Sequence, residues 1–480
     1  MAQPYAPPCQ DSQIRSEPCP QAAGRLPQPK TQTLGLAACV LASSMAFIDG
    51  SALTVALPAL KAEFGGSVLV VQWVLNGYIL ALAALTMVGG ALADSLGRSR
   101  VLTWGTIAFA LTSIVCALAP SASVLIGARV AQGAAAALVT PASLALIGEL
   151  FEKSQRTRAI GIWAAMSSLT TAGGPLLGGW LVEVFSWRAV FWINVPIGVV
   201  ALLLLLAVPN RPSEKPGRFD VVGSVLLACG LLALVAAMSA IGPAEGGSDE
   251  EALSLALPMT LMLFVAAASL FAAFWYWQSR TDHPLIPPYV FRRRRFAGLN
   301  LATVAIYAGL SMVFFLLPFE LVEHRGMSSM QAGLVFLPFT LCVAFLSPTF
   351  GALSERVGLK TMLTTGALLS SIGFAWLAVE QGAAAWRSLY LPMTVAGLAF
   401  AVLVAPLTAG VMASVNEADE GLASGINNTA SRVAQMIGVA LASLFITSSV
   451  GFVSGLWLAS AFCVVGAATV YVSFRRAGQA

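Results

Sequence analysis

The chain has 480 residues, of which 58% are hydrophobic and only 10% are charged, and its formal net charge is +4 at pH 7. Soluble proteins carry about a quarter charged residues, so this composition excludes an ordinary soluble protein of two to four domains. The charged residues cluster in short segments between apolar stretches that are long enough to cross a bilayer. The sequence therefore predicts an all-α polytopic membrane protein.

In chain order, a Pro- and Gln-rich segment comes first and is predicted to be a disordered cytoplasmic tail. Fourteen apolar stretches follow, and each is predicted to be a membrane span. They lie near residues 33–58, 72–93, 101–119, 122–148, 158–182, 189–208, 220–241, 255–276, 297–320, 332–353, 361–379, 388–413, 425–448 and 452–474. We expect the tail over 1–32, a six-helix half over 33–208, two inserted helices with linkers over 209–296, a second six-helix half over 297–474 and a cytoplasmic C-terminal tail over 475–480.

Lys and Arg residues predict the orientation, because short cytoplasmic loops carry the positive excess. With the N-terminal tail inside, most of the 26 Lys and Arg residues fall in cytoplasmic segments. Both termini should then be cytoplasmic, in a multi-pass protein of the cytoplasmic (inner) membrane. The run FRRRRF at 291–296 adjoins a span, so it is predicted to bind lipid headgroups and not nucleic acid.

Signatures of catalysis and of bound cofactors are missing from the sequence. With only His283 and His324, a zinc site built on histidines is improbable, and we expect no metal. No Lys follows a Gly, and neither GxG nor GxSxG occurs, which excludes a P-loop, a dinucleotide fingerprint and a nucleophile elbow. The chain is therefore predicted not to be an enzyme and to need no cofactor.

One polar phrase occurs twice, each time at the end of an apolar run: GALADSLGRSR at 90–100 and GALSERVGLK at 351–360. Gly90, Asp94 and Gly97 recur as Gly351, Glu355 and Gly358, always 261 positions later. If the two inserted helices are set aside, both copies follow the second span of a six-span half, as in transporters built from parallel repeats. The alternative is a generic tight turn, which needs glycine but not an acid and a base in register.

Several motifs together resemble one family. GALADSLGRSR is similar to motif A of the major facilitator superfamily, LIGARVAQGAAAALVTPASLALI to its span-4 motif, and GIWAAMSSLTTAGGPLLGGW to its span-5 antiporter motif. IDGSALTVALP, SWRAVFWINVPIG and GRFDVVGSVLL resemble segments of the fourteen-span drug:proton antiporter branch. The resemblance implies the major facilitator fold, with two six-helix halves and two inserted helices. Thr54 and Thr170 depart from the usual Asn and Gly of these motifs.

Asp49 and Arg129 are the two buried charges that most need explanation. Arg432 also lies within a span, about two turns from its cytoplasmic end, where its side chain is predicted to snorkel to the headgroups; the alternative is that it lines the transport pathway. Span 1 runs outward for nine residues beyond Asp49, and span 4 begins nine residues before Arg129, so both lie roughly 13 Å below the outer boundary. An ion pair between them is therefore possible, and Asp49 is the candidate proton-linked or cation-binding carboxylate. The alternatives are that Arg129 bonds only to backbone carbonyls and that Asp49 caps a helix break. The span-4 resemblance adds Gln132, and Tyr78 faces either the cavity or the interfacial belt.

The repeated phrase and the span-5 motif are predicted to serve conformational change. We expect Asp94 to act as a latch that contacts Arg98 and a helix N-terminus. The latch is predicted to comprise Gly90, Asp94, Gly97, Arg98, Glu355 and Gly358, with the first copy the stronger. The small residues of the span-5 motif are predicted to let helices pack closely, and the resemblance implies contact with the other half of the protein. These residues are Gly161, Gly174, Pro175, Gly178 and Gly179.

The predicted function is export of small amphiphilic molecules in exchange for protons, by alternating access in a lipid bilayer. The resemblance implies a monomer driven by the proton gradient. Two alternatives stay open at this point: a facilitator or symporter that imports a metabolite, and a receptor built on an inactive transporter fold.

Overall fold

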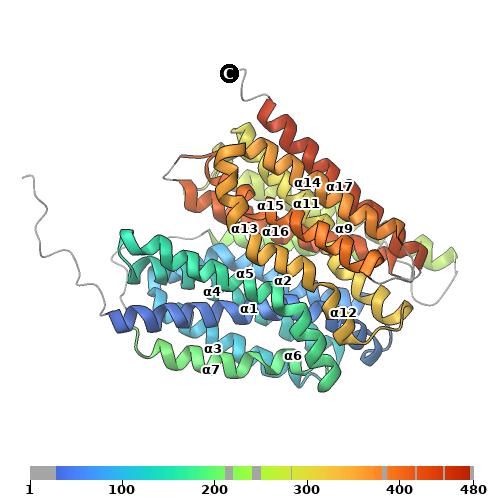
Figure 1. The fold of residues 1–480 in the computed structure, drawn as a ribbon, viewed down its shortest axis with the longest axis horizontal. Helices are drawn as coiled ribbons and strands as arrows, with labels where there is room; N and C mark the ends of the chain where they lie inside the picture. The colour runs from blue at the N-terminus through green and yellow to red at the C-terminus, as the bar shows by residue number, and fades with distance from the viewer. Residues whose placement is uncertain are drawn as a thin grey trace, which may run out of the picture.

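The structure is a computed structural model, and over the residues that it describes it consists of helices without a β-strand (Figure 1). Those residues are 29–210, 220–240, 250–282, 284–380, 386–416, 419–446 and 449–475. The predicted tail lies outside them except for its last four residues, which instead form the start of the first helix. Pro29 fits there because the first N–H groups of a helix have no partner to lose.

The N-terminal half contains seven helical segments, and a pair of long helices follows it. The first seven are α1 (Pro29–Glu63), α2 (Val68–Leu96), α3 (Arg98–Ala117), α4 (Ala122–Leu150), α5 (Lys153–Val184), α6 (Ala189–Trp192) and α7 (Asn194–Leu205). The pair is α8 (Val221–Ser239) and α9 (Glu250–Gln278).

The C-terminal half follows after the short helix α10 (Pro288–Phe291). It consists of α11 (Arg294–Phe319), α12 (Ser329–Val335), α13 (Leu337–Val357), α14 (Leu359–Val379), α15 (Leu391–Met412), α16 (Glu420–Ala442) and α17 (Ser449–Arg475). The two last predicted spans are thus separate helices, α16 and α17.

Eleven helices in the described part of the chain are long and apolar enough to cross a membrane. The three other predicted spans correspond to α5, to the run Ala189–Leu205 and to α16. The run is short, and α5 and α16 carry more polar residues than the rest. The structure is therefore compatible with the fourteen predicted spans.

Two predicted spans are interrupted. The predicted span over 189–208 is broken at Ile193 between α6 and α7, and the one over 332–353 is broken at Phe336 between α12 and α13. A proline follows within three residues of each break, at Pro196 and Pro338. Because proline has no N–H and clashes with the carbonyl four residues earlier, it disrupts the preceding turn.

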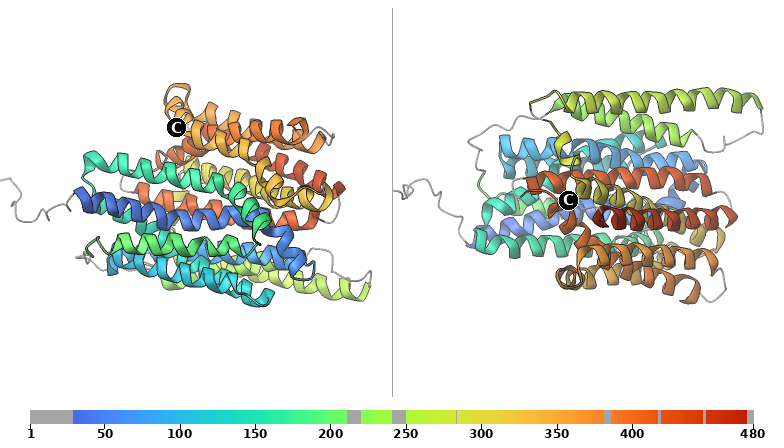
Figure 2. Two further views of the ribbon diagram at one scale, coloured as in Figure 1. Left: turned by 60° about the horizontal axis from the view of Figure 1, so that its bottom comes forward. Right: turned by 90° about the horizontal axis from the view of Figure 1, so that it is seen from above.

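The α8–α9 pair lies against the side of the bundle and not between the halves (Figure 2, right). α8 packs on α2 and on α16, and α9 packs on α8. The pair therefore bridges the two halves from outside and leaves the interior to helices of α1–α7 and α11–α17.

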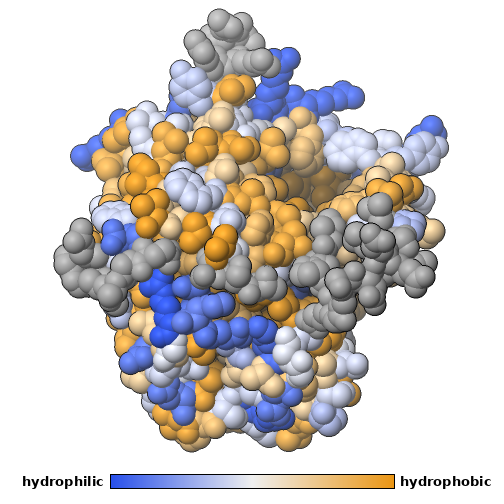
Figure 3. Space-filling view, turned by 90° about the vertical axis from the view of Figure 1, so that its right-hand side faces the viewer, coloured by the Kyte–Doolittle hydropathy of each residue, from blue (hydrophilic) through white to orange (hydrophobic). Residues whose placement is uncertain are grey.

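The two halves are joined at the end of the bundle opposite to the start of α1, called here the far end. Lys61 Nζ donates to Glu323 Oε2 at 2.8 Å, and the Met330 N–H donates to Glu183 Oε2 at 3.1 Å. Each contact links α1 or α5 of one half to the α11–α12 region of the other. Figure 3 views this end and shows hydrophilic side chains gathered in a band across it.

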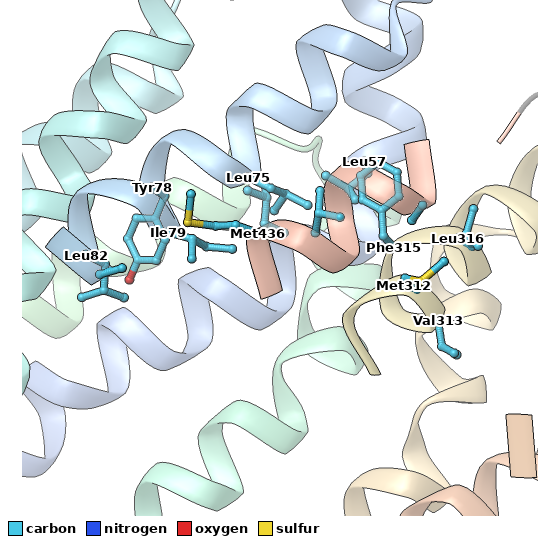
Figure 4. Packing of buried hydrophobic residues seen from close by; sticks show 14 of the residues in the cluster. Leu57, Leu75, Tyr78, Ile79, Leu82, Met312, Val313, Phe315, Leu316 and Met436 are labelled. Atoms are coloured by element: carbon cyan, nitrogen blue, oxygen red, sulfur yellow. The ribbon is translucent and has the colours of Figure 1, made fainter. Parts of the chain in front are cut away.

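Apolar side chains from both halves also meet in the middle of the bundle (Figure 4). Met436 of α16 lies beside Leu75, Tyr78 and Ile79 of α2, and all four side chains are buried. Because lipid tails are as apolar as these side chains, close packing and not burial from water stabilises such contacts. The two halves thus touch through α2 and α16 in the interior of the bundle.

Candidate functional site

The structure brings together Asp49 of α1 and Arg129 of α4 inside the N-terminal half. Arg129 Nη1 donates to Asp49 Oδ2, and both side chains have 0% exposure. The ion pair that the sequence made possible is therefore present. Arg129 Nε also donates to the Val74 carbonyl at 3.1 Å, so one guanidinium serves a carboxylate and a backbone acceptor together.

Amide and hydroxyl groups complete the polar shell of Asp49. Gln132 Nε2 and Asn194 Nδ2 both donate to Asp49 Oδ1, each at 3.1 Å. The same two nitrogens donate to Ser113 Oγ at 2.7 and 3.3 Å, and Arg129 Nη1 donates to Gln132 Oε1 at 2.6 Å. Helices α1, α3, α4 and α7 each contribute at least one of these side chains. Three donors therefore satisfy the two oxygens of the buried carboxyl group, as burial of such a group requires.

Aromatic rings form the apolar wall of this cluster. The guanidinium carbon of Arg129 lies 4.3 Å from the ring centroid of Tyr78 and 5.6 Å from that of Phe191. The Tyr78 hydroxyl donates to the Ala46 carbonyl at 3.2 Å, which fixes the ring over the charge. Of the two positions predicted for Tyr78, the structure has the interior one, because α2 packs along α4. Cation–π contact in a dry site stabilises the guanidinium by about 2 kcal/mol.

Not every polar atom of the cluster is used. Among the described residues, Arg129 Nη2 and Asn194 Oδ1 are buried and have no hydrogen-bond partner within the protein. Asn76, two residues before Tyr78 on α2, is also buried with neither its Oδ1 nor its Nδ2 partnered. Unpaired buried groups of this kind are costly. They leave the cluster and its surroundings with spare donors and acceptors.

The repeated phrase forms the same backbone turn in both halves. Gly97 has φ of +102° and ψ of +129°, and Gly358 has φ of +92° and ψ of +136°. Only glycine adopts this region readily, so glycine is needed at both positions. Each glycine ends one helix and begins the next, between α2 and α3 in one half and between α13 and α14 in the other.

The first copy is tied to its surroundings by Arg98. Its guanidinium donates to Asp94 Oδ1 at 3.2 and 3.3 Å and to the Ala145 carbonyl of α4 at 3.2 Å, and it lies 3.8 Å from Glu149 Oε2. The expected contact of Asp94 with Arg98 is therefore present. The expected contact of Asp94 with a helix N-terminus stays a prediction, and so does the latch itself.

The second copy has a different environment. Leu359 stands where the first copy has Arg98, so this copy has no guanidinium at that position. A Cβ added at Gly358 would meet nothing within 4 Å, whereas one added at Gly97 would collide with the side chain of Asn210. The side chain of Glu355 lies outside the described part of the chain.

Close packing in the first part of the span-5 motif joins α5 to α1. A Cβ at Gly174 would collide with the side chain of Ser51, and one at Gly178 would collide with the carbonyl of Ala52. The two glycines are four residues apart and therefore lie on one face of α5. The absence of side chains on this face lets the two helix backbones approach each other closely.

The same motif also reaches the other half of the protein. A Cβ at Gly179 would collide with the Ser329 carbonyl at the start of α12. In the opposite direction, a Cβ at Gly333 of α12 would collide with the Pro175 carbonyl. Glycines on both sides thus bring α5 and α12 together, and this contact between the halves agrees with what the resemblance implied.

Gly161 of the span-5 motif makes no close contact of this kind, and neither does Gly90 of the predicted latch. Gly161 has no atom within 4 Å of an added Cβ, because the first half of α5 is largely exposed. Gly90 has only an ordinary contact at 3.7 Å with Pro141. α2 and α4 instead approach closely at Gly89, where a Cβ would collide with the Ala137 carbonyl, and at Gly133, where one would collide with the Tyr78 carbonyl. The close packing expected at Gly161 is therefore not present in this structure.

Sequence reasoning missed Ser113 and Asn194 as members of the cluster. Asn194 lies in the phrase FWINVPIG, and an amide inside an apolar span is a signal that could have identified it. Ser113 gives no such signal, because isolated serines are common in membrane helices and bond to their own backbone.

The fold and this sealed charged cluster define the class of polytopic membrane transporters. Residues 39–297 and 299–479 match the Major Facilitator Superfamily. The chain therefore belongs to the Major Facilitator Superfamily, as its motifs predicted.

Relatives in this family carry names that refer to multidrug resistance or to export. The chain is 34% identical over 434 residues to the multidrug resistance protein Stp of Mycobacterium tuberculosis, covering 90% of this chain and 77% of that protein. It is 34% identical over 427 residues to the cephamycin export protein CmcT of Amycolatopsis lactamdurans, covering 87% and 86%. A crystal structure of the peptide transporter POT in complex with sulfate matches with a TM-score of 0.69, covering 95% and 96% at 15% identity. That last likeness concerns the fold alone.

Proposed function

We propose that this protein exports small amphiphilic molecules from the cell in exchange for protons, by alternating access across the cytoplasmic membrane. It works without enzyme chemistry or a cofactor, as a monomer with both termini in the cytoplasm. The names of the export relatives support drug or antibiotic efflux. The observation that supports proton coupling is the fully buried cluster around Asp49, because this cluster contains an ionisable carboxylate paired with the Arg129 guanidinium.

Protonation of Asp49 would act through the ion pair. A neutral carboxyl no longer attracts Arg129, so the guanidinium would need another partner, either a substrate or a backbone carbonyl. Since α1 and α4 supply the pair, its loss changes the contacts between two helices of the N-terminal half. A proton entering from outside and leaving to the cytoplasm could thus bias the halves between two arrangements, provided that each arrangement has a different proton affinity.

Coupling is tested with purified protein in proteoliposomes that carry an imposed pH gradient and a fluorescent amphiphile. We expect the substrate to move in the direction opposite to proton flow. Reversal of the pH gradient should reverse the direction of net substrate movement. Asp49→Asn should abolish the response to the gradient. Full proton-coupled efflux in Asp49→Asn would remove this carboxylate from the mechanism. Movement in the same direction as protons would favour the symporter alternative.

A further inference from the structure

Helix α16 carries a polar stripe along one side. The stripe consists of Asn427, Asn428, Ser431, Arg432 and Gln435, and all five are partly buried. The spacings between neighbours along the stripe alternate between one and three residues, so the side chains share one face of the helix. A polar face at membrane depth does not point into lipid, so it must face protein or a water-filled cavity.

The neighbours of α16 show where this face points. Asn427 and Gly438 face α11, through a hydrogen bond from Thr303 Oγ1 at 2.8 Å and through the close approach of Gly438 to the α11 backbone. Gly425 and Met436 face α2 of the other half, as Figure 4 shows for Met436. With 3.6 residues per turn, Arg432 lies between these two directions. Its side chain therefore faces the space between α2 of one half and α11 of the other.

Two tyrosines, one from each half, lie beside the part of α16 that carries Arg432. Tyr78 of α2 lies beside Met436, one turn beyond Arg432. Tyr307 of α11 lies on the same helix face as Thr303 and Ser311, which bond to Asn427 and Gln435 of α16. The Tyr78 hydroxyl is engaged by the Ala46 carbonyl. The Tyr307 hydroxyl makes no hydrogen bond within the described structure, and its ring packs edge-on against Phe400 with centroids 6.2 Å apart. A phenol donor thus lies near the guanidinium on the interface between the halves.

Charge balance differs sharply between Arg432 and the Asp49 cluster. Asp49 is neutralised by Arg129, so that cluster contributes no net charge to the interior. Arg432 forms no ion pair or hydrogen bond with any residue that the structure describes. A charge at membrane depth costs a few kcal/mol or more unless it has a partner or water. The interior between the halves, as far as it is described, therefore carries an unbalanced positive charge on a partly buried, donor-rich surface.

We propose that Arg432 binds the acidic group of an anionic amphiphile, with the Tyr307 hydroxyl and the amides of the α16 stripe as further donors. This inference rests on the proposed function, because it assigns the substrate class of the same transporter. A carboxylate or sulfonate fits the guanidinium as a bidentate acceptor. The apolar remainder of the molecule would lie against the aromatic and aliphatic side chains that surround the stripe.

The test compares two dyes that share a xanthene core and differ in charge: anionic fluorescein and cationic rhodamine 123. Equilibrium binding to the full chain in nanodiscs is measured by fluorescence anisotropy, without any ion gradient. Wild type should bind fluorescein more tightly than rhodamine 123. Arg432→Gln should weaken fluorescein binding by roughly 10- to 100-fold, the range expected for a charged hydrogen bond, and should leave rhodamine 123 binding within about 2-fold.

Two further variants separate recognition from folding. Arg432→Lys keeps the positive charge and should recover most of the fluorescein affinity. Arg188→Gln removes a positive charge from the far end, where it pairs with Glu63 at 3.1 Å, and should change neither affinity. Melting temperatures of all variants in nanodiscs report their folding. Absence of fluorescein binding in wild type, or an equal loss of both dyes in Arg432→Gln, would overturn the inference.

Failure of the inference can be told apart from failure of the proposed function. The binding assay uses no proton gradient, so Arg432-dependent fluorescein binding stands even if gradient-driven export is absent. Conversely, proton-driven export of rhodamine 123 together with no anion binding would overturn only the anionic substrate class.

Discussion

The two halves of this transporter differ in how the charged side chains inside them are paired and buried. The N-terminal half encloses Asp49 and Arg129 at 0% exposure and surrounds them with amides and aromatic rings. The C-terminal half places Arg432 on a partly buried face with no partner among the described residues. The two proposals above assign proton coupling to the paired, fully buried charge and ligand binding to the unbalanced one. The same six-helix arrangement thus holds a paired charge in one half and a charge without a described partner in the other.

The largest effect is expected where the sealed pair is broken. Asp49→Asn leaves Arg129 charged and buried without a counterion, which should cost about 3–5 kcal/mol of stability. Arg432→Gln breaks no contact with the described residues and should change stability by less than about 1 kcal/mol. Thermal unfolding of both variants in the same detergent measures the difference. Equal losses of stability in Asp49→Asn and Arg432→Gln would contradict the difference proposed between the fully buried ion pair and the partly buried arginine.

The repeated turn provides a second comparison between the halves. Gly97→Ala forces a positive φ on alanine and drives its Cβ into the side chain of Asn210, whereas Gly358→Ala meets nothing within 4 Å and has the backbone strain alone. Strain of this kind costs of order 1–3 kcal/mol, so Gly97→Ala should be the more destabilised variant.

A background variant separates strain from collision at Gly97. Asn210→Ala removes the side-chain amide that the new Cβ at position 97 would strike. In this background, Gly97→Ala should lose about as much stability as Gly358→Ala. Unfolding midpoints of the four variants give the answer. A Gly358→Ala loss as large as that of Gly97→Ala in the unmodified background would show that surroundings do not distinguish the two turns.

The smallest effects are expected at the acids of the repeated turn, on rate and not on stability. Asp94 and Arg98 form an exposed i,i+4 pair, so Asp94→Asn should change stability by only a few tenths of a kcal/mol. If Asp94 is a conformational latch, turnover should fall several-fold while substrate affinity stays nearly constant. Glu355→Gln should lower turnover less, because Leu359 replaces the arginine of the first copy.

Initial transport rates at several substrate concentrations separate turnover from affinity in these variants. Arg98→Leu makes the first copy resemble the second and is the matched control. A large loss of affinity in Asp94→Asn would count against the latch and in favour of a binding role.

Particular residues show how far sequence patterns reach. The hydropathy of α1 and α4 placed Asp49 and Arg129 at one depth, and depth alone was enough to predict that they could pair. Glycines that permit positive φ were predictable at Gly97 and Gly358, because a polar phrase between two apolar runs requires a sharp turn. Patterns could not rank glycines within a helix, so close packing was expected at Gly161 as well as at Gly174, Gly178 and Gly179, whereas of these four glycines the structure has it at the last three.

By itself the sequence determined the class of protein, the order of its spans, the repeated turn and the common depth of one buried acid and one buried base. Bilayer thickness and the cost of buried charge dictate these features, and both act along a single helix. Only the tertiary structure decided that Ser113 and Asn194 complete the Asp49 cluster and that Arg432 faces the meeting point of the halves. Those assignments depend on the rotation of each helix against neighbours that are distant in sequence, which side-chain packing decides.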